Sequence, residues 1–291
     1  MKAIMREVPL SKICGLFGKT RQAWYDIKQR DSSSSWQKAV VLDLVQAVKK
    51  MVPKSGTIKL YKELKPTFVS QNIKLGRDGL HALLADHGLL VKRHKKRVYT
   101  TQSSHHYRKW PSLIQGMVPS RPEQLWVSDI TYLSTKNGFI HLSLITDAYS
   151  RKIVGYELSP NLKADGCIAA LKRALKARAL PAESLIHHSD RGVQYCCNDY
   201  VSVLQKNGVK ISMTQTGSPY ENALAERVNG ILKQEFELNQ QFPSFQAAVK
   251  QVNSAIYRYN QYRRHFGCDL QTPATKHNAG IQAVCQVKSV I

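Results

Sequence analysis

The sequence has no long apolar run: nothing in its 291 residues approaches the ~20 consecutive apolar residues that a membrane-spanning helix requires. The N-terminus, Met1-Lys2-Ala3, lacks the apolar core and cleavage pattern of a secretion signal. Both absences predict a cytoplasmic protein with no membrane partner. The chain is long enough for one sizeable hydrophobic core and one or two small domains.

Cysteine pairs with the spacing of zinc or redox motifs are also missing. None of the six cysteines forms a CxxC pair, and Cys196 and Cys197 are adjacent. A metal cluster of these two with His187 and His188 is conceivable, but two vicinal pairs make poor tetrahedral geometry. Reduced, partly buried cysteines are the favoured interpretation.

Acidic residues are scarce, since 20 Asp and Glu stand against 43 Lys and Arg and give a formal net charge of +23. The excess is concentrated at the front: residues 1–110 hold 23 basic and 7 acidic residues, a net of +16, and residues 111–291 have a net of +7. Such a charge implies a polyanionic partner. We therefore expect double-stranded DNA as the partner and the front of the chain as its main binding region.

Residues 1–32 are interpreted as a helix-turn-helix-like segment. The stretch 9–30 predicts two short helices around Gly18, with Thr20 capping the second helix and Arg21 exposed toward DNA. A helical hairpin that only packs would have a similar pattern, and the high charge favours DNA contact.

Residues 33–98 are predicted to form a small helical DNA-binding domain with a basic tail. "DSSSSW" (31–36) predicts a linker or a helix start, and helices follow over 35–51, within "LYKELKPTF" and within "LGRDGLHALLADHG", which closes at Gly88. The tail carries five residues predicted to contact phosphates, namely Lys92, Arg93, Lys95, Lys96 and Arg97. Residues 99–123, rich in Ser, Thr, Pro and basic residues, predict a linker.

Residues 124–265 change character and predict an α/β domain. Three strands at 125–135, in "FIHLSLITDAYS" and in "KIVGYELS" form a meander whose first turn is Lys136-Asn137-Gly138. The elements predicted after them are helix 163–180, strand 184–189, helix 198–207, strand 210–214, helix 221–237 and helix 244–263. This order predicts a ribonuclease-H-like core preceded by a small all-α region, with residues 266–291 as a C-terminal tail.

Three acidic residues of this core are expected to converge. Asp129 interrupts an otherwise apolar strand, and a buried charge is costly unless it is paired or binds a cation. If the first strand is central, the fourth lies beside it in parallel, and its terminal Asp190 meets Asp129. The long helix carries Asn222, Glu226 and Lys233 on one stripe, which points Glu226 toward the two aspartates.

The three carboxylates are predicted to be metal ligands and catalytic residues. Carboxylates that crowd together repel one another unless divalent cations neutralise them, and oxygen-only ligands select Mg²⁺ or Mn²⁺. A pair of such ions, ~4 Å apart, activates the attacking oxygen and stabilises the leaving oxygen in phosphodiester displacement. Other acids are predicted to be structural: Asp147 to fix a turn, Asp199 to cap a helix and Glu221 to assist a helix start.

Four motifs in this region, "DITY", "LSLITDAYSRKIVGY", "IHHSDRGVQY" and "ENALAERVNGILKQEF", resemble the DDE catalytic core of bacterial insertion-sequence transposases and retroviral integrases. Sixty residues separate Asp129 from Asp190, and 35 separate Asp190 from Glu226, an interval that marks the integrase-like branch. The likeness continues upstream through "GRDGLHALLADHGLL" and is that of a second-frame (OrfB) transposase.

The resemblance implies Mg²⁺-dependent strand cleavage at terminal inverted repeats, after which the freed 3′-hydroxyl attacks another phosphodiester. It makes Lys233 a contact to the element-end DNA and places Asn222 and Thr131 beside DNA at the active site. It also implies a homo-oligomer on repeat and target DNA, an upstream-frame product as a fusion partner, and association with the nucleoid.

Three departures from the family pattern support an alternative. Arg264 stands where proline is usual, Cys268 where leucine is common and Ile58 where arginine is usual. A decayed, catalytically inactive regulator that still binds the repeats is therefore the second interpretation. A simple ribonuclease-H-like nuclease is the third, and the large basic front argues against it.

Overall fold

The computed structural model describes residues 9–91, 106–181, 185–215 and 222–288. The predicted basic tail, Lys92 to Arg97, and Glu221 therefore lie outside the described residues. The chain divides into two compact units, one formed by residues 1–50 with 60–90 and the other by residues 51–59 with 91–291. Within the described ranges, no helix is long and apolar enough to cross a membrane.

The first unit is all-helical and is formed by most of helices α1 (Leu10–Leu16), α2 (Arg21–Met51), α3 (Thr57–Ser70) and α4 (Arg77–Asp86). The helices predicted in "LYKELKPTF" and "LGRDGLHALLADHG" are confirmed, and the chain leaves α4 through Gly88 with a positive φ of 65°. The buried residues at the centre come from α2, α3 and α4 and include Val41, Val45, Leu60, Leu64, Phe68, Leu80 and Leu84.

The predicted break at residues 31–36 is wrong, because α2 continues through it for 31 residues in all. Serine is only a few tenths of a kcal/mol less favourable in a helix than alanine, so a serine-rich stretch does not by itself end a helix. Neither glycine nor proline occurs between Gly18 and Pro53 to end the helix. The prediction that Thr20 caps the start of this helix is confirmed, because Thr20 Oγ1 accepts a 3.1 Å hydrogen bond from the Ala23 amide.

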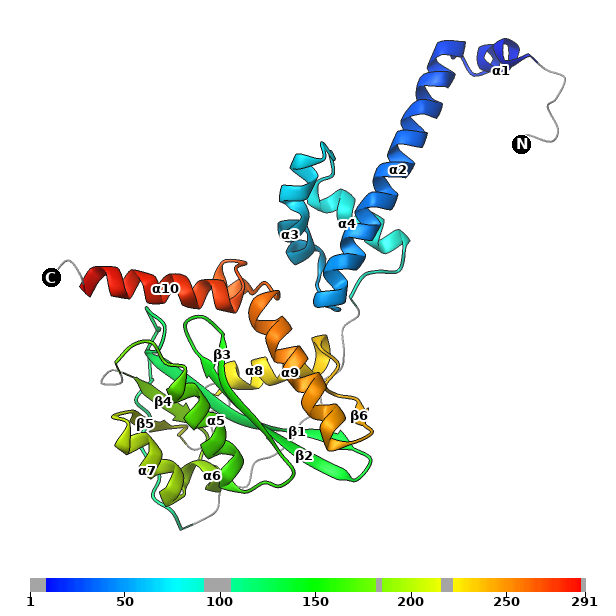
Figure 1. Ribbon diagram of the computed structural model, residues 1–291. Helices are drawn as coiled ribbons and strands as arrows, with labels where there is room; N and C mark the ends of the chain where they lie inside the picture. The colour runs from blue at the N-terminus through cyan, green and yellow to red at the C-terminus, as the bar shows by residue number, and fades with distance from the viewer. Residues whose placement is uncertain (1–8, 92–105, 182–184, 216–221, 289–291) are drawn as a thin grey trace. The chain divides into compact units, whose positions relative to one another are not determined.

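The second unit is built on a mixed sheet whose central strand is β1 (Figure 1). The strands are β1 (Leu125–Thr135), β2 (Gly138–Asp147), β3 (Ile153–Ser159), β4 (Ile186–Ser189), β5 (Lys210–Met213) and β6 (Gln241–Phe242). Their order is β3-β2-β1-β4-β5, with β6 paired to β1. The first three strands are antiparallel, and β4 runs parallel to both β1 and β5. This is the predicted ribonuclease-H-like arrangement.

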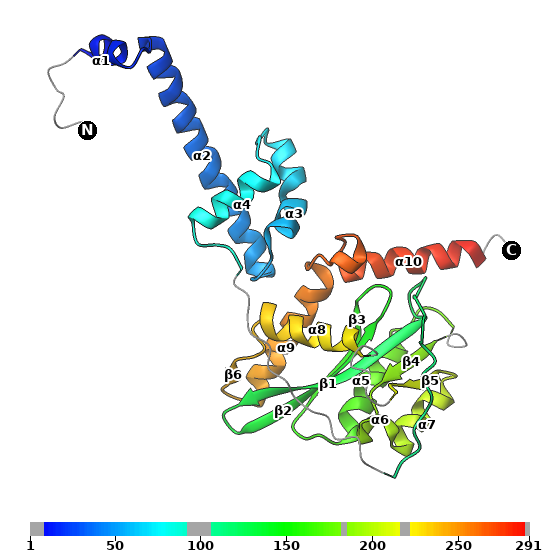
Figure 2. The same cartoon turned by 180° about the vertical axis from the view of Figure 1, so that it is seen from behind.

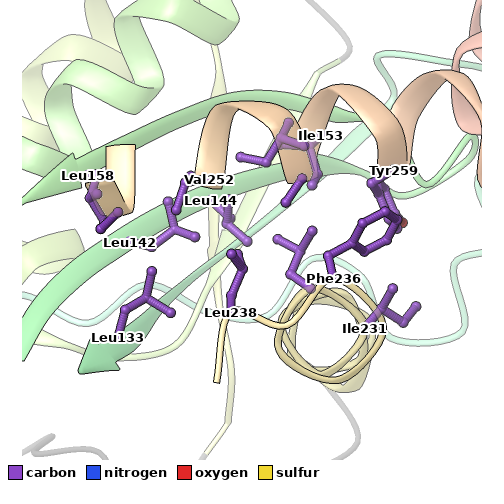
Figure 3. Close-up of a cluster of buried hydrophobic side chains, with 14 of the residues drawn as sticks. Leu133, Leu142, Leu144, Ile153, Leu158, Ile231, Phe236, Leu238, Val252 and Tyr259 are labelled. Atoms are coloured by element: carbon purple, nitrogen blue, oxygen red, sulfur yellow. The ribbon is translucent and has the colours of Figure 1, made fainter. Parts of the chain in front are cut away.

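Helices cover both faces of this sheet (Figures 1 and 2). The helices on one face are α5 (Ala164–Lys176), α6 (Val193–Cys196) and α7 (Asn198–Lys206), and those on the other are α8 (Ala223–Glu235) and α9 (Phe245–Gln261). Because side chains alternate along a strand, β1 buries Trp126 under α5 and α7 but Leu133 under α8 and α9. Figure 3 shows part of the second cluster, to which Leu144 of β2 and Ile231 of α8 contribute together with Phe236.

Residues predicted as a C-terminal tail form a further short helix, η2 (Phe266–Cys268), and helix α10 (Pro273–Lys288). The buried His277 of α10 has Nδ1 3.0 Å from Ser150 Oγ. Asp147, as predicted, fixes the turn after β2, because its carboxylate accepts hydrogen bonds from the Ser150 amide and hydroxyl. Asp199 lies in the first turn of α7 without forming a side-chain cap, so that prediction is wrong.

Candidate active site

The two aspartates lie at the same level on adjacent parallel strands. The β1–β4 register pairs Leu125 with Ile186 and Val127 with His188. Asp190, two residues after His188 and just beyond the end of β4, is therefore level with Asp129 on β1. The predicted central position of the first strand is what brings them together.

Asp129 is a half-buried carboxylate whose oxygens both accept hydrogen bonds. Asn229 Nδ2 on α8 donates to Oδ2 at 2.7 Å, and the Ile130 amide donates to Oδ1 at 2.9 Å. Burial and the nearby negative charge of Asp190 raise the pKa of Asp129 to about 7, against the lowering effect of both hydrogen bonds. Glu226 adds to the rise. Asp190 and Glu226 therefore both act electrostatically on Asp129.

Asp190 both shapes a turn and contributes a charge. Its Oδ1 accepts a 2.9 Å hydrogen bond from the Gly192 amide, which holds the loop between β4 and α6. A Cβ at Gly192 would lie only 3.0 Å from that same oxygen, so the residue must be small for this close approach. Burial raises the pKa of the Asp190 carboxyl. Its other oxygen is not used in this turn.

Helix α8 supplies the remaining groups. Val228 and Ile231 bury one side of the helix, which leaves Glu226 exposed on the other. In the described part of the chain, no three His, Cys, Asp or Glu side chains are close enough to share one ion. Glu226 is thus near enough to influence Asp129 but does not close a ligand set with the two aspartates.

Lys233 is half-buried on α8 near Asp129. Burial lowers the pKa of its ammonium, and the negative charge of Asp129 opposes that shift. Within the described residues Lys233 forms no ion pair with Glu237, the acidic residue one helical turn further on. Of the other predicted DNA contacts, Thr131 is buried on β1, and Arg21 is exposed at the start of α2 in the first unit.

Asn222 and Asn229 fasten α8 to β1 on either side of Glu226. Asn222 Nδ2 donates to the Ser128 carbonyl at 3.3 Å, and Asn229 holds Asp129 as described. The side-chain oxygens of both asparagines are buried and find no hydrogen-bond partner among the described residues. The sequence reasoning missed Asn229, although its spacing of three residues from Glu226 and seven from Asn222 places it on the same stripe.

The opposite face of the sheet carries a second polar group that was not predicted. His187 Nε2 lies 2.6 Å from Ser128 Oγ and 2.9 Å from the Tyr200 hydroxyl, and all three residues are buried. Burial, with a smaller effect of His188, lowers the pKa of His187 to about 3, so the ring is neutral. His188 in turn has Nδ1 2.9 Å from Ser212 Oγ. The two histidines therefore serve hydrogen bonds between strands and helices.

Comparisons with known proteins agree on one family. Two models, each described as an integrase core domain, match residues 119–219 and 207–273. The chain is 35% identical over 266 residues to the uncharacterized 31 kDa protein of insertion element IS600 from Shigella sonnei, covering 90% of this chain and 96% of that protein. It is 30% identical over 284 residues to transposase InsF of insertion sequence IS3A from Escherichia coli K12, covering 94% and 96%.

Solved structures similar to the chain include the catalytic core domain of HTLV-2 integrase in complex with magnesium, in its trimeric form. The two share 18% identity with a TM-score of 0.44, over 54% of this chain and 98% of that one. On the sequence relatives and the family models, the chain belongs to the bacterial insertion-sequence transposases with an integrase-type core and is a transposase of the DDE type.

Proposed function

We propose that this transposase cuts DNA at the terminal inverted repeats of its element and joins the freed 3′-hydroxyl to target DNA, with Asp129, Asp190 and Glu226 as the catalytic carboxylates. The observation that carries the proposal is the level placement of Asp129 and Asp190 on β1 and β4, with Glu226 on α8 acting on the same carboxylate. Burial and the negative charges of Asp190 and Glu226 raise the pKa of Asp129 to about 7, which favours a site that a bound cation would keep ionised.

The donor set of these residues fits Mg²⁺ or Mn²⁺, and two ions are proposed. Three carboxylates, together with the buried and unpartnered side-chain oxygens of Asn222 and Asn229, offer only oxygen atoms. Asp129, Asp190 and Glu226 would hold the ions. When bound, such a pair supplies activation of the attacking oxygen and charge stabilisation at the leaving oxygen.

The neighbouring residues orient the carboxylates and the DNA. Asn229 fixes the rotamer of Asp129 through a hydrogen bond to one oxygen and adds no charge. Lys233, half-buried and close to Asp129, is suited to hold a phosphate beside the carboxylates. Asn222, just before α8, and Thr131 on β1 are both buried close to Asp129, the first through its hydrogen bond to the Ser128 carbonyl and the second along the strand, and they are proposed to lie beside the DNA at the active site.

The grip on DNA outside the core is assigned to the helical first unit with Arg21 and to the basic residues from Lys92 to Arg97. The net charge of +16 on residues 1–110 supports this division. We further propose a homo-oligomer on the repeats, a fusion with the upstream-frame product as the complete enzyme, and a place on the nucleoid as a consequence of DNA binding.

The experiment is incubation of the full chain with a labelled terminal repeat and an unlabelled target duplex, in Mg²⁺ and separately in Mn²⁺. Joined products support the proposal. Cleavage without joining would identify a nuclease, and retardation of the repeat in a gel with no cleavage would identify a DNA-binding regulator. Either of those two outcomes would contradict the proposed function.

A further inference from the structure

A hollow of about 500 Å³ lies where helices α5 and α7 end beside each other. It is lined by Lys172, Leu175, Lys176, Val203, Lys206 and Asn207. Leu175 and Val203 are partly buried and pack against the core beneath, so they form an apolar floor. The three lysines surround that floor, two from α5 and one from α7.

The charge in this hollow is uncompensated. Lys172 and Lys176 are one helical turn apart on α5, where like charges repel, and Lys206 ends α7. No acidic residue lines the hollow, and in the described ranges none of the three lysines makes an ion pair. Arg173, their neighbour on α5, is by contrast paired with Glu157 at 2.5 Å. The helix therefore neutralises one basic side chain and leaves the hollow positive.

Helix ends alone do not account for the cluster. A lysine in the last turn of a helix is favoured by the helix dipole, and this suffices for Lys176 and Lys206. Lys172 lies a further turn back, where the dipole effect has fallen off, yet it faces the same hollow. Helix stability therefore does not explain why three lysines line one concave surface.

We propose that this hollow binds backbone phosphates of duplex DNA, an inference that rests on the proposed function for the identity of the polyanion. Ammonium groups hold phosphates as point charges, and the apolar floor can accommodate the sugars between them. The hollow lies on α5 and α7, and Asp129 faces α8 on the other side of the sheet. The duplex bound in the hollow is therefore a different stretch from the one at the carboxylates.

The direct test is lysine-selective acylation of the full-length protein, read by mass spectrometry with and without a duplex that contains a terminal repeat and flanking sequence. Lys172, Lys176 and Lys206 should lose reactivity when DNA is present, and Lys163 at the opposite end of α5 should not. Equal reactivity with and without DNA would overturn the proposal. So would protection that appears without DNA and grows with protein concentration, since it would indicate contact between copies of the chain.

A matched pair of triple variants provides the second measurement. Replacing the three hollow lysines with glutamine should make log Kd less dependent on log salt by about 2.7, at about 0.9 for each lost phosphate contact. Glutamine at Lys136, Lys163 and Lys250, three exposed lysines elsewhere on the second unit, changes the charge equally and should leave the slope unchanged. Equal slopes for both variants would contradict the inference. Joining without protection of the hollow refutes this inference alone, whereas protection without cleavage refutes the proposed function alone.

Discussion

The two faces of the central sheet carry different polar groups, neutral ones on the α7 face and carboxylates on the α8 face. The difference is seen at two consecutive residues of β1. Ser128 points under α7, where its hydroxyl and that of Tyr200 both lie within hydrogen-bond distance of the neutral His187 ring. Asp129 points under α8, where burial and the negative charges of Asp190 and Glu226 raise its pKa to about 7. One strand thus contributes to a neutral hydrogen-bond network on one side and to a cluster of carboxylates on the other.

The difference separates fold from function. Buried neutral groups that share hydrogen bonds brace β1, β4 and α7 and carry no charge that a cation would have to neutralise. Half-buried aspartates beside asparagine oxygens without partners are held less readily in their charged state unless a cation is bound. Perturbed carboxylates on the α8 face are therefore where the chemistry is expected, and the α7 face is where stability is expected.

The largest effect is expected from the carboxylates themselves. Asp190→Asn and Glu226→Gln each remove a ligand charge with little change of shape, so joining should fall by about a thousandfold or more. Binding to the repeat should stay within about twofold, because the grip lies mainly elsewhere. A strand-joining assay beside a gel-shift titration measures both. Joining near the wild-type rate in either variant would remove that residue from the site.

Asn229 tests whether orientation matters as well as charge. Asn229→Ala removes a hydrogen bond to a charged group, typically worth about 1.5–3 kcal/mol, so joining should slow by about 10- to 100-fold. Asn253→Ala, an exposed asparagine on α9, is the control and should leave the rate unchanged. The concentration of Mn²⁺ that half-saturates binding should rise only for Asn229→Ala. An unchanged rate and unchanged Mn²⁺ binding would show that Asn229 only packs the helix.

The neutral face predicts a pH effect on stability. The pKa of His187 is about 3 in the folded chain and near 6.5 when unfolded, so the unfolded state binds the extra proton. The contribution of the neutral His187 ring to the free energy of unfolding is therefore complete above pH 6.5. Below that pH it should fall by up to about 1.4 kcal/mol for each pH unit. His187→Phe removes this dependence. The difference in free energy of unfolding between wild type and variant, measured by urea titration from pH 7.5 to 4.5, should shrink as pH falls; a constant difference would contradict a buried neutral ring.

The smallest effect is expected from Lys233. Lys233→Ala should slow joining by about tenfold through a lost phosphate contact, with the melting temperature little changed. Lys233→Glu should be slower still, because it places a like charge against the DNA. Lys250→Ala, an exposed lysine on α9, serves as the control. If both Lys233 variants join DNA at the wild-type rate, the residue is only part of the surface.

Most of the core could be predicted from sequence because its signals are local. The strand-like, largely apolar stretch "LWVSDITYLST" and the amphipathic pattern of "ADGCIAALKRALK" predicted β1 and α5, and the order of the elements predicted the neighbours of β1. The site was accessible for the same reason: a charge within an apolar strand is unusual, and helical spacing places Glu226 beside it. Asn229 was not predicted, because burying an uncharged amide on a helix is less costly than burying a charge and so does not stand out in the sequence.

Features that depend on tertiary packing could not be predicted. Residues after 265 lack a strong amphipathic pattern, and α10 is held by a buried contact between His277 and Ser150, 127 residues away. The network of Ser128, His187 and Tyr200 likewise joins three elements through side chains whose sequence contexts are ordinary. In α2, the serine-rich stretch favoured the prediction of a break, but no glycine or proline is present there to end the helix.

The most direct test uses the neighbouring pair on β1. Strand joining of a labelled terminal repeat in Mg²⁺ is measured for wild type, Ser128→Ala and Asp129→Asn under one set of conditions. Ser128→Ala should join at a rate within about tenfold of wild type, since it removes one neutral hydrogen bond worth about 1 kcal/mol on the face away from the carboxylates. Asp129→Asn should give no detectable joining while still binding the repeat. Joining by Asp129→Asn at a rate close to that of Ser128→Ala would contradict the assignment of the chemistry to the α8 face.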